Sequence, residues 1–303
     1  MIPPSGRQVE LTQADQRAVI TEVGGGLRRY DVGTWAVVDG YGRDELSSGG
    51  RGQLLVPWPN RIGDGRYHFG SHEHQLPLDE PQRRNAIHGL VRWEAWEISQ
   101  PSASTARATY CLHPRPGYPF HLELRVDYDL TDDGLALTVR ATNLGPDPAP
   151  YGAGWHPYLS VSTPTVDDAI LQIPAEKSMP TDDRGIPCGG TVPVAGTAFD
   201  FREARRIGDT VLDTCYTELR PDADGLVRAR LSASDGECAV ELWADRSVAY
   251  LMVFTGDTLD VRRRQGLAIE PMTCPPDAFR SGQGLIVLEP GETFSSKWGI
   301  RPD

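Results

Sequence analysis

Apolar and polar residues alternate with a period of two along much of the chain, which is the pattern of β-strands with one buried face. In residues 121–130 leucine, valine and tyrosine alternate with mostly charged residues, and after the turn sequence TDDG the alternation resumes over residues 135–141. This predicts an antiparallel hairpin. The same pattern predicts three further hairpins: residues 65–78 turning near Gly70, residues 227–245 turning at Asp235-Gly236, and residues 284–301 turning at Pro290-Gly291.

Helical periodicity is nearly absent from the chain. We find no long segment with the 3.6-residue period of an amphipathic helix, and only residues 200–210 are expected to hold a short helix. Turn signals recur without a change of composition, a fixed repeat or a low-complexity linker. The predicted fold class is therefore all-β, with one large antiparallel β-sandwich domain over residues 1–303.

Composition and charge restrict the partners. The 303 residues include 32 glycines and 25 prolines and carry a net charge of −12, so the chain lacks the basic surface that nucleic acid requires. Five cysteines without a CxxC pair indicate neither a disulfide framework nor a zinc knuckle. No signal-peptide pattern opens the sequence, and no apolar run approaches about 18 residues. We therefore expect a cytoplasmic monomer or homodimer with a small-molecule ligand and no membrane partner.

Two stretches offer basic side chains near strand ends. In "PWPNR" two prolines interrupt a strand and Arg61 follows, either as a surface residue after a turn or as a donor to a ligand oxygen. In "AIHGLVR" His88 precedes Gly89, and Arg92 follows four residues later. His88 has both a structural and a functional interpretation. Arg92 is a candidate contact for an anionic group or one half of a structural ion pair.

The stretch "GAGWHPYLS", residues 152–160, places a histidine among small and apolar neighbours. Read as a strand, it directs Trp155 to the core and His156 to the opposite face. His156 shares that face with Gly152 and Gly154, so we expect this face to form the wall of a ligand cleft.

Glu270 in "LAIEPMTC" is expected at the end of a strand, because Pro271 lacks the amide hydrogen that a sheet ladder needs. A carboxylate there would be half-buried, and burial raises the pKa of a carboxyl toward that of an effective base at neutral pH. The alternative is a solvated glutamate in a loop.

Other reactive groups are poorly represented. His72 and His74 form a His-x-His pair that imitates a metal site with Glu80, but no convincing further ligand is evident. The chain has no G-x-S-x-G nucleophile motif, and its "GGG" sequence lacks the helix that a phosphate loop precedes. We expect no metal ion and no cofactor.

Five short motifs, taken in order, resemble the aldose 1-epimerase (galactose mutarotase-like) family. They are "PNR" with Arg61, "AIHGL" with His88, "GWHPYL" with His156, "VLDTCYTEL" with Asp213, and "LAIEPMTCPPDAF" with Glu270. The resemblance covers roughly residues 20–300 and implies a β-supersandwich fold. It also implies interconversion of the α and β anomers of a hexose without a cofactor.

The resemblance also implies the roles of these residues. In this family a glutamate takes the proton of the C1 hydroxyl and a histidine protonates the ring oxygen, so that the ring opens and closes again from the other face. By this resemblance Glu270 is the base and His156 the acid, while Arg61, His88 and Asp213 hold sugar oxygens.

The substrate and two other functions stay open on the sequence. "PWPNR" and "HGLVRW" resemble a less characterised bacterial branch of the family, in which a phosphorylated or sulfonated hexose meeting Arg92 is an alternative substrate. A non-catalytic carbohydrate-binding or sensing protein would keep the binding residues but need no base. A glycoside hydrolase or lyase would need a second carboxylate besides Glu270, for which Asp213 is the candidate.

Overall fold

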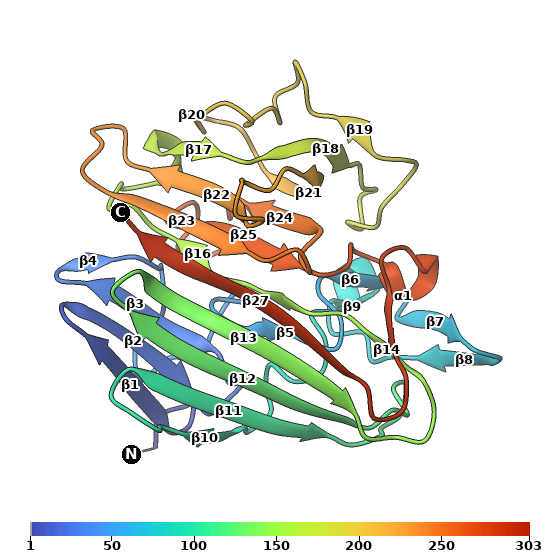
Figure 1. Ribbon diagram of the computed structural model, residues 1–303. Helices are drawn as coiled ribbons and strands as arrows, with labels where there is room; N and C mark the ends of the chain where they lie inside the picture. Colours follow the sequence, from blue (N-terminus) through green and yellow to red (C-terminus); the bar gives the residue numbers. More distant parts are fainter. Residues whose placement is uncertain (1) are drawn as a thin grey trace.

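The computed structural model describes residues 2–303, and within them β-strands form almost all the regular structure (Figure 1). The largest sheet is antiparallel, and β11, β12, β13 and β27 form the broad front face in Figure 1. Its nine strands are, in spatial order, β10 (Glu97–Ser99), β11 (Thr105–Leu112), β12 (Leu122–Thr131), β13 (Gly134–Asn143), β27 (Thr293–Pro302), β23 (Ala239–Ala244), β22 (Val227–Ser232), β17 (Ile170–Gln172) and β20 (Arg205–Arg206).

A second antiparallel sheet of eight strands carries most of the residues of interest. Its strands are, in spatial order, β19 (Val192–Pro193), β18 (Ala175–Met179), β21 (Asp213–Leu219), β24 (Tyr250–Phe254), β25 (Leu267–Met272), β15 (Gly154–Trp155) and β5 (Leu54–Leu55), and β16 (Tyr158–Leu159) also pairs with β25.

Smaller elements complete the molecule. A four-stranded sheet contains β1 (Gln8–Gln13), β2 (Gln16–Thr21), β3 (Leu27–Val32) and β4 (Trp35–Ala36). Three two-stranded pairs are β6 (Arg61–Gly63) with β9 (Asn85–Ile87), β7 (Arg66–Phe69) with β8 (His72–Gln75), and β14 (Ala149–Tyr151) with β26 (Ile286–Leu288). The described helical segments are α1 (Ala278–Ser281) and two 3₁₀ turns, η1 (Pro81–Arg83) and η2 (Val166–Asp168). Within residues 2–303 no helix has the length and apolar character needed to cross a membrane.

Alternation of side chains determines the faces of the long strands. In the β12–β13 hairpin Leu130 pairs with Leu135, and the leucine, valine and tyrosine positions of β12 are all buried while Glu123 and Asp129 are exposed. Because a one-residue slip would reverse both faces, the register is strongly specified. The predicted hairpins β7–β8 and β22–β23 are also confirmed.

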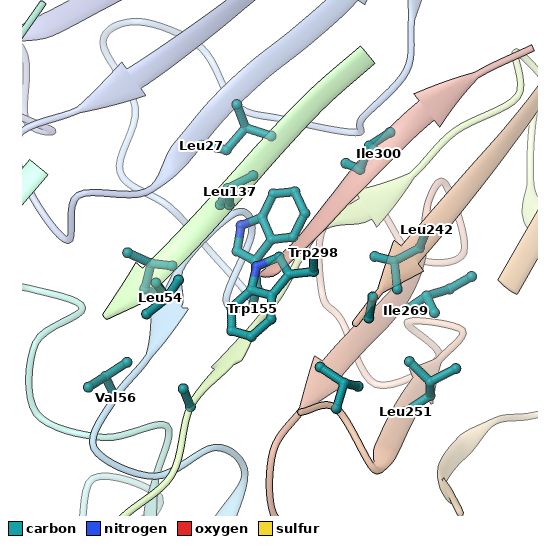
Figure 2. Packing of buried hydrophobic residues seen from close by; sticks show 14 of the residues in the cluster. Leu27, Leu54, Val56, Leu137, Trp155, Leu242, Leu251, Ile269, Trp298 and Ile300 are labelled. Carbon is teal, nitrogen blue, oxygen red and sulfur yellow. The ribbon is translucent and has the colours of Figure 1, made fainter. Parts of the chain in front are cut away.

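The hydrophobic core lies between the two large sheets. Figure 2 shows Trp155 of β15 and Trp298 of β27 in the middle of a cluster whose side chains come from strands of both sheets. Both indole rings are fully buried. Leu137 and Leu242 reach this cluster from the nine-stranded sheet, and Ile269 reaches it from β25. The strand that carries Glu270 is therefore anchored by its own apolar residues in the core.

The predicted hairpin over residues 284–301 is wrong in its pairing. β26 pairs with β14, while β27 pairs with β13 on one side and with β23 on the other. The turn itself forms, since the Glu292 amide donates to the Glu289 carbonyl at 2.9 Å. Both edges of β27 are occupied by other strands, so no edge is free for β26.

The helix predicted over residues 200–210 is also wrong. This segment contains the short strand β20, which pairs with β17. The Arg205 guanidinium lies 3.8 Å from the centre of the Phe201 ring and donates to the Asp200 carbonyl at 2.8 Å. These local contacts and the pairing with β17 hold the segment in a non-helical path.

Candidate active site

Glu270 lies inside β25 and is only 2 % exposed, not half-buried at a strand end as predicted. The ladder with β24 continues through Pro271, which pairs with Leu251. A proline is tolerated here because the neighbouring chain on the other side of β25 is interrupted opposite it. There, two short strands, β15 and β16, pair with β25 but leave a gap between them.

Backbone hydrogen bonds locate this gap. The Ile269 amide donates to the Pro157 carbonyl at 3.3 Å, and the Thr273 amide donates to the Ala153 carbonyl at 2.9 Å. Pro271 stands between these two donors and has no amide hydrogen to offer. Pro271, which cannot donate, therefore lies opposite the point where the segment between β15 and β16 turns away from β25. His156 belongs to that segment.

His156 faces Glu270 across the gap. Its Nε2 atom is 3.3 Å from Glu270 Oε1, and the histidine is 4 % exposed. Its backbone is fixed by two hydrogen bonds, since its amide donates to the Gln53 carbonyl at 3.0 Å and its carbonyl accepts from the Gly52 amide at 2.9 Å. The neighbouring Trp155 points into the core, as the alternation predicted.

The His156 ring is held by aromatic neighbours. It stacks on the Tyr158 ring with centroids 5.0 Å apart and planes inclined by 19°. The His88 ring stands at 79° to it in a T-shaped contact, with centroids 5.3 Å apart. The buried Arg51 guanidinium lies 4.4 Å from the centre of the Tyr158 ring and pairs with Asp39 at 3.0 Å. These contacts fix the orientation of the imidazole in the way that a preorganised site requires.

A glycine outside the predicted motif makes room for His156. A Cβ atom on Gly50 would lie 2.7 Å from His156 Cδ2, and Gly50 has a φ of +81°. Gly152 and Gly154, which we expected to clear space for a ligand, admit protein atoms instead. A Cβ at the first would collide with Cys274, and a Cβ at the second would lie 2.9 Å from Pro59.

His88 is oriented by Asn60. The His88 amide donates to the Asn60 carbonyl at 2.9 Å, and His88 Nδ1 accepts the Asn60 amide hydrogen at 3.2 Å. Because Nδ1 acts as an acceptor, a neutral His88 carries its proton on Nε2. Burial lowers the pKa of His88 well below its ordinary value, and the neighbouring His156 and arginines add to this effect. His88 is thus a neutral hydrogen-bond donor.

Arg61 is held by a bidentate ion pair. Its Nε and Nη2 atoms donate to the two carboxylate oxygens of Glu80 at 2.9 and 3.0 Å. The side-chain amide of Asn85 donates to the same carboxylate at 2.8 Å. Arg61 is 8 % exposed, so the guanidinium is nearly buried and fixed in direction. Glu80 therefore belongs to this site and not to a metal site with His72 and His74.

Asp213 and Arg92 lie nearer to solvent. Asp213 begins β21, its side chain is 39 % exposed, and Arg83 approaches it at 3.8 Å. Arg92 pairs with Asp79 at 2.6 Å, which is the structural ion pair considered from the sequence. Arg92 also lines the same cavity as Asp213, so the two interpretations of this arginine are compatible.

All six candidate residues from the sequence meet at one cavity of about 450 Å³, a size typical of small-molecule sites. The structure adds residues that the sequence did not single out for this site. They come from loops, from the η1 turn (Arg83) and from the end of β24 (Phe254), and no sequence pattern marks them as neighbours of the cavity. The cavity lining includes Arg61, His88, Arg92, His156, Asp213 and Glu270, together with Gly50, Asn60, Asp79, Glu80, Arg83, Trp93 and Phe254.

Burial governs the protonation of the central pair. It raises the pKa of Glu270 well above the ordinary 4.5, the charge of Asp213 acts in the same direction, and Arg61 opposes it. Burial also lowers the pKa of His156 to about 3, a backbone hydrogen bond opposes this, and the charge of Arg51 adds to the lowering. The favoured state is a protonated Glu270 beside a neutral His156, so the pair holds one proton.

Two polar atoms of the pair are left without a protein partner. Glu270 Oε2 and His156 Nδ1 are buried and accept or donate no hydrogen bond among the described residues. Such groups cost about 1–3 kcal/mol each when buried alone. This cost is typical of a site whose polar groups are reserved for a ligand.

Three side chains of the cavity also offer the kinds of ligand atom that bind a transition metal. One ligand atom each of His88, His156 and Glu270 lies within 4.8 Å of the others. Two imidazole nitrogens and a carboxylate oxygen match the ligands of several catalytic zinc sites. The same three groups equally suit the hydroxyl and ring oxygens of a sugar.

Comparison with known proteins gives the class of this site. The family model for aldose 1-epimerase matches residues 7–301. The chain therefore belongs to the aldose 1-epimerase family, whose members are isomerases acting on carbohydrates. The family resemblance, the enzyme class and the β-supersandwich fold predicted from the sequence are confirmed.

Individual relatives support this assignment. The chain is 35 % identical over 289 residues to the uncharacterised protein YihR of Escherichia coli, covering 95 % of this chain and 91 % of that protein. It is 28 % identical over 274 residues to the aldose 1-epimerase of E. coli, covering 81 % and 78 % of the two chains. It is 30 % identical over 258 residues to the galactose mutarotase of Mus musculus, covering 78 % and 74 %.

Solved structures show the same fold. The GalM/aldose epimerase homologue of C. elegans superimposes with a TM-score of 0.87 at 18 % identity, covering 98 % of each chain. The galactose 1-epimerase of Lactobacillus acidophilus gives a TM-score of 0.82 at 22 % identity, covering 96 % of this chain and 92 % of that one.

Proposed function

We propose that this protein is an aldose 1-epimerase that interconverts the α and β anomers of a hexose by acid–base opening and closing of the ring. The observation that carries this proposal is the buried contact between His156 Nε2 and Glu270 Oε1 at 3.3 Å on the wall of the cavity. Ring opening needs one proton acceptor and one proton donor, and this pair supplies both.

The chemical steps follow from the proton held by the pair. Transfer of the proton from Glu270 to His156 gives a carboxylate and an imidazolium. Glu270 then takes the proton of the C1 hydroxyl while His156 gives its proton to the ring oxygen, and the bond between C1 and that oxygen breaks. The product is an open-chain aldehyde. Rotation about the C1–C2 bond and reversal of the same proton transfers give the other anomer.

Neighbouring groups assist the charged form of the pair. Arg61 lowers the pKa of Glu270 against the effect of burial, so its positive charge favours the carboxylate that acts as base. In this proposal the Arg61 guanidinium and the Nε2 proton of His88 donate to sugar oxygens, and Asp213 accepts from a sugar hydroxyl. The orientation of Arg61 by Glu80 and of His88 by Asn60 reduces the ordering needed when substrate binds.

Polarimetry tests this proposal. Freshly dissolved α-D-glucose or α-D-galactose should lose its initial optical rotation faster with the protein than without it. The same acceleration after dialysis against a chelator would exclude a metal role for the His88, His156 and Glu270 group. Binding detected by calorimetry without any acceleration would favour a sugar-binding protein, and release of reducing ends from an oligosaccharide would favour a hydrolase.

A hexose with a phosphate or sulfonate group is a second candidate substrate. The observation in its favour is that Arg83 and Arg92 line the cavity in addition to the buried Arg61. Arg92 is already paired with Asp79, so an anionic group would have to share or replace that carboxylate. Arg92→Gln should then slow the epimerisation of the anionic hexose about tenfold or more and leave that of a neutral hexose unchanged. Equal effects on both would exclude this candidate.

A further inference from the structure

A cluster of metal-ligating side chains lies outside the active-site cavity. One ligand atom each of Cys111, His113 and His121 lies within 4.8 Å of the others. Cys111 Sγ is 3.0 Å from His121 Nε2, and the rings of His113 and His121 have centroids 5.0 Å apart. None of the three lines the cavity that contains Glu270. We propose that this cluster binds one divalent transition-metal ion of the zinc class at the outer face of the nine-stranded sheet.

The distances between the ligand atoms suit such an ion. With a Zn–S bond of about 2.3 Å and Zn–N bonds of about 2.0 Å, tetrahedral angles place the ligand atoms about 3.3–3.6 Å apart. The Cys111–His121 contact is slightly shorter than this and the other separations are at most 4.8 Å, so rotation of partly exposed side chains brings all three into place. One thiolate and two imidazoles suit zinc, cobalt or copper better than magnesium or calcium.

The backbone around the cluster is already fixed. Cys111 and His121 flank the pair Leu112 and Leu122, which are cross-strand partners of β11 and β12 and are fully buried. The His121 carbonyl accepts the Leu144 amide at 2.8 Å. Binding therefore orders side chains more than it orders the main chain, which favours affinity.

The loop between the two histidines is also anchored. The Tyr118 hydroxyl donates to the Pro150 carbonyl at 2.7 Å within the interior, and the Arg115 amide donates to the Tyr118 carbonyl at 3.0 Å. An ion bound here would tie the end of β11 to the start of β12. Glu123, the cross-strand partner of Cys111, is exposed on the same face and adds a negative charge that favours a cation.

The binding step balances in protons and charge. The neutral Cys111 thiol loses its proton to solvent when the metal–sulfur bond forms, and the two neutral imidazoles bind without losing a proton. Three protein ligands leave one tetrahedral position, which water fills. From the sequence we expected no metal ion, because no CxxC pair occurs and His72 and His74 lack a convincing further ligand; Cys111, His113 and His121 were not singled out.

Titration of the metal-free 303-residue protein with Co²⁺ tests this proposal. We expect one ion per chain and the absorption bands of a tetrahedral cobalt–thiolate centre, displaced by Zn²⁺. Cys111→Ser should abolish the thiolate band. His121→Ala, and His113→Ala at an exposed residue, should each weaken Co²⁺ binding about tenfold or more. The matched control is Cys188→Ser, since Cys188 is an exposed free cysteine outside the cluster.

The outcomes separate this site from the epimerase site. Wild-type protein and Cys188→Ser should show the band and gain thermal stability with Zn²⁺, and Cys111→Ser should do neither while keeping its epimerase rate. Absence of a thiolate band in the wild type, its survival in Cys111→Ser, or its loss in Cys188→Ser would overturn the proposal.

Discussion

At the scale of single residues, the molecule buries two titratable groups where apolar side chains would be more stable. Glu270 and His156 are 2 % and 4 % exposed, and one polar atom of each has no partner among the described residues. Buried ionisable groups with strongly shifted pKa values are typical of functional sites. This arrangement links the catalytic proposal directly to stability.

Glu270→Gln should remove the base while preserving the shape of the side chain. We expect the epimerisation rate to fall about 10²- to 10⁴-fold, the usual contribution of a general acid or base. His156→Asn should cause a loss of the same order, and the double variant should be little worse than either single one because the two residues act as a unit. Polarimetry would measure the rates, and circular dichroism would check that the variants fold. A double variant whose loss equals the product of the two single losses would contradict this prediction.

The same Glu270→Gln variant should be more stable than the wild type at neutral pH. Because burial raises the pKa of Glu270 in the folded state, the folded protein binds more protons than the unfolded chain above pH 4.5, and stability falls as pH rises. Glutamine does not ionise, so the variant should be more stable than the wild type at pH 7, and this difference should vanish below pH 4. Denaturant titrations at both pH values test this, and an equal gain at both would be evidence against the raised pKa.

The acid limb of the pH–rate profile should lie below the ordinary histidine range. Adding a second proton to the pair requires protonation of His156, whose pKa burial lowers from 6.5 to about 3. The value of kcat/KM for the free enzyme should therefore stay nearly constant from pH 7 down through pH 6 and fall only in more acidic solution. A loss centred at pH 6.5 would show that His156 titrates like an exposed histidine.

At the scale of the elements, the site depends on a break between two strands. β15 and β16 separate opposite Pro271, and the loop that carries Gly50 packs against the buried segment that carries His156. A left-handed residue without a side chain is needed at Gly50, because a Cβ atom there would overlap His156 Cδ2 at 2.7 Å.

Gly50→Ala should therefore displace His156 and lower the epimerisation rate. The matched control is Gly70→Ala in the β7–β8 turn, where φ is also positive and no atom lies within 4 Å of the added methyl group. Both variants place an alanine in the left-handed conformation, which should lower the free energy of unfolding by about 1–2 kcal/mol. Only Gly50→Ala should also lose activity, by about tenfold or more. Comparable activity in both variants would show that Gly50 has no role in positioning His156.

The elements that could be predicted from sequence are those with local signals. Alternation placed the β12–β13 and β22–β23 hairpins correctly because neighbouring strands pair through a short turn. The pairing of β27 with β13 and β23 could not be predicted, since strands distant in sequence compete for the same edges. Likewise, Pro271 indicated a strand end because its missing donor is visible in sequence but the gap opposite it is not.

The site residues, like the strands, could be predicted only where the sequence carries a local signal. The sequence motifs singled out His156 and Glu270, and the structure brings both to one cavity. From the sequence, Glu80 is considered only as a metal ligand and Asn60 stands in the PNR motif without a role, although they orient Arg61 and His88. Their positions result from how the β6–β9 pair and the η1 turn fold around the cavity, and that depends on tertiary contacts.

At the scale of the whole molecule, one continuous core joins the two large sheets. We predict that the chain unfolds as a single domain, with fluorescence and far-ultraviolet circular dichroism changing at the same denaturant concentration. Trp298→Ala should cost about 3–5 kcal/mol and shift both signals together, because the fully buried indole contacts the core shared by the sheets. Trp93→Ala, at a residue 50 % exposed, serves as the control and should cost less than about 0.5 kcal/mol. Separate transitions for the two signals would contradict a single domain.

The central claim is that the Glu270–His156 pair interconverts the anomers of a hexose in the cavity. Proton NMR exchange spectroscopy at anomeric equilibrium measures this directly, because it follows the exchange between the α and β anomers. It would use neutral, phosphorylated and sulfonated hexoses, each with the wild type, Glu270→Gln and His156→Asn. We predict that the wild type accelerates α–β exchange for at least one of these sugars and that both variants lower its exchange rate about 10²-fold or more toward the uncatalysed rate. Exchange at the wild-type rate in either variant, or no acceleration of any of these sugars by the wild type, would contradict the claim.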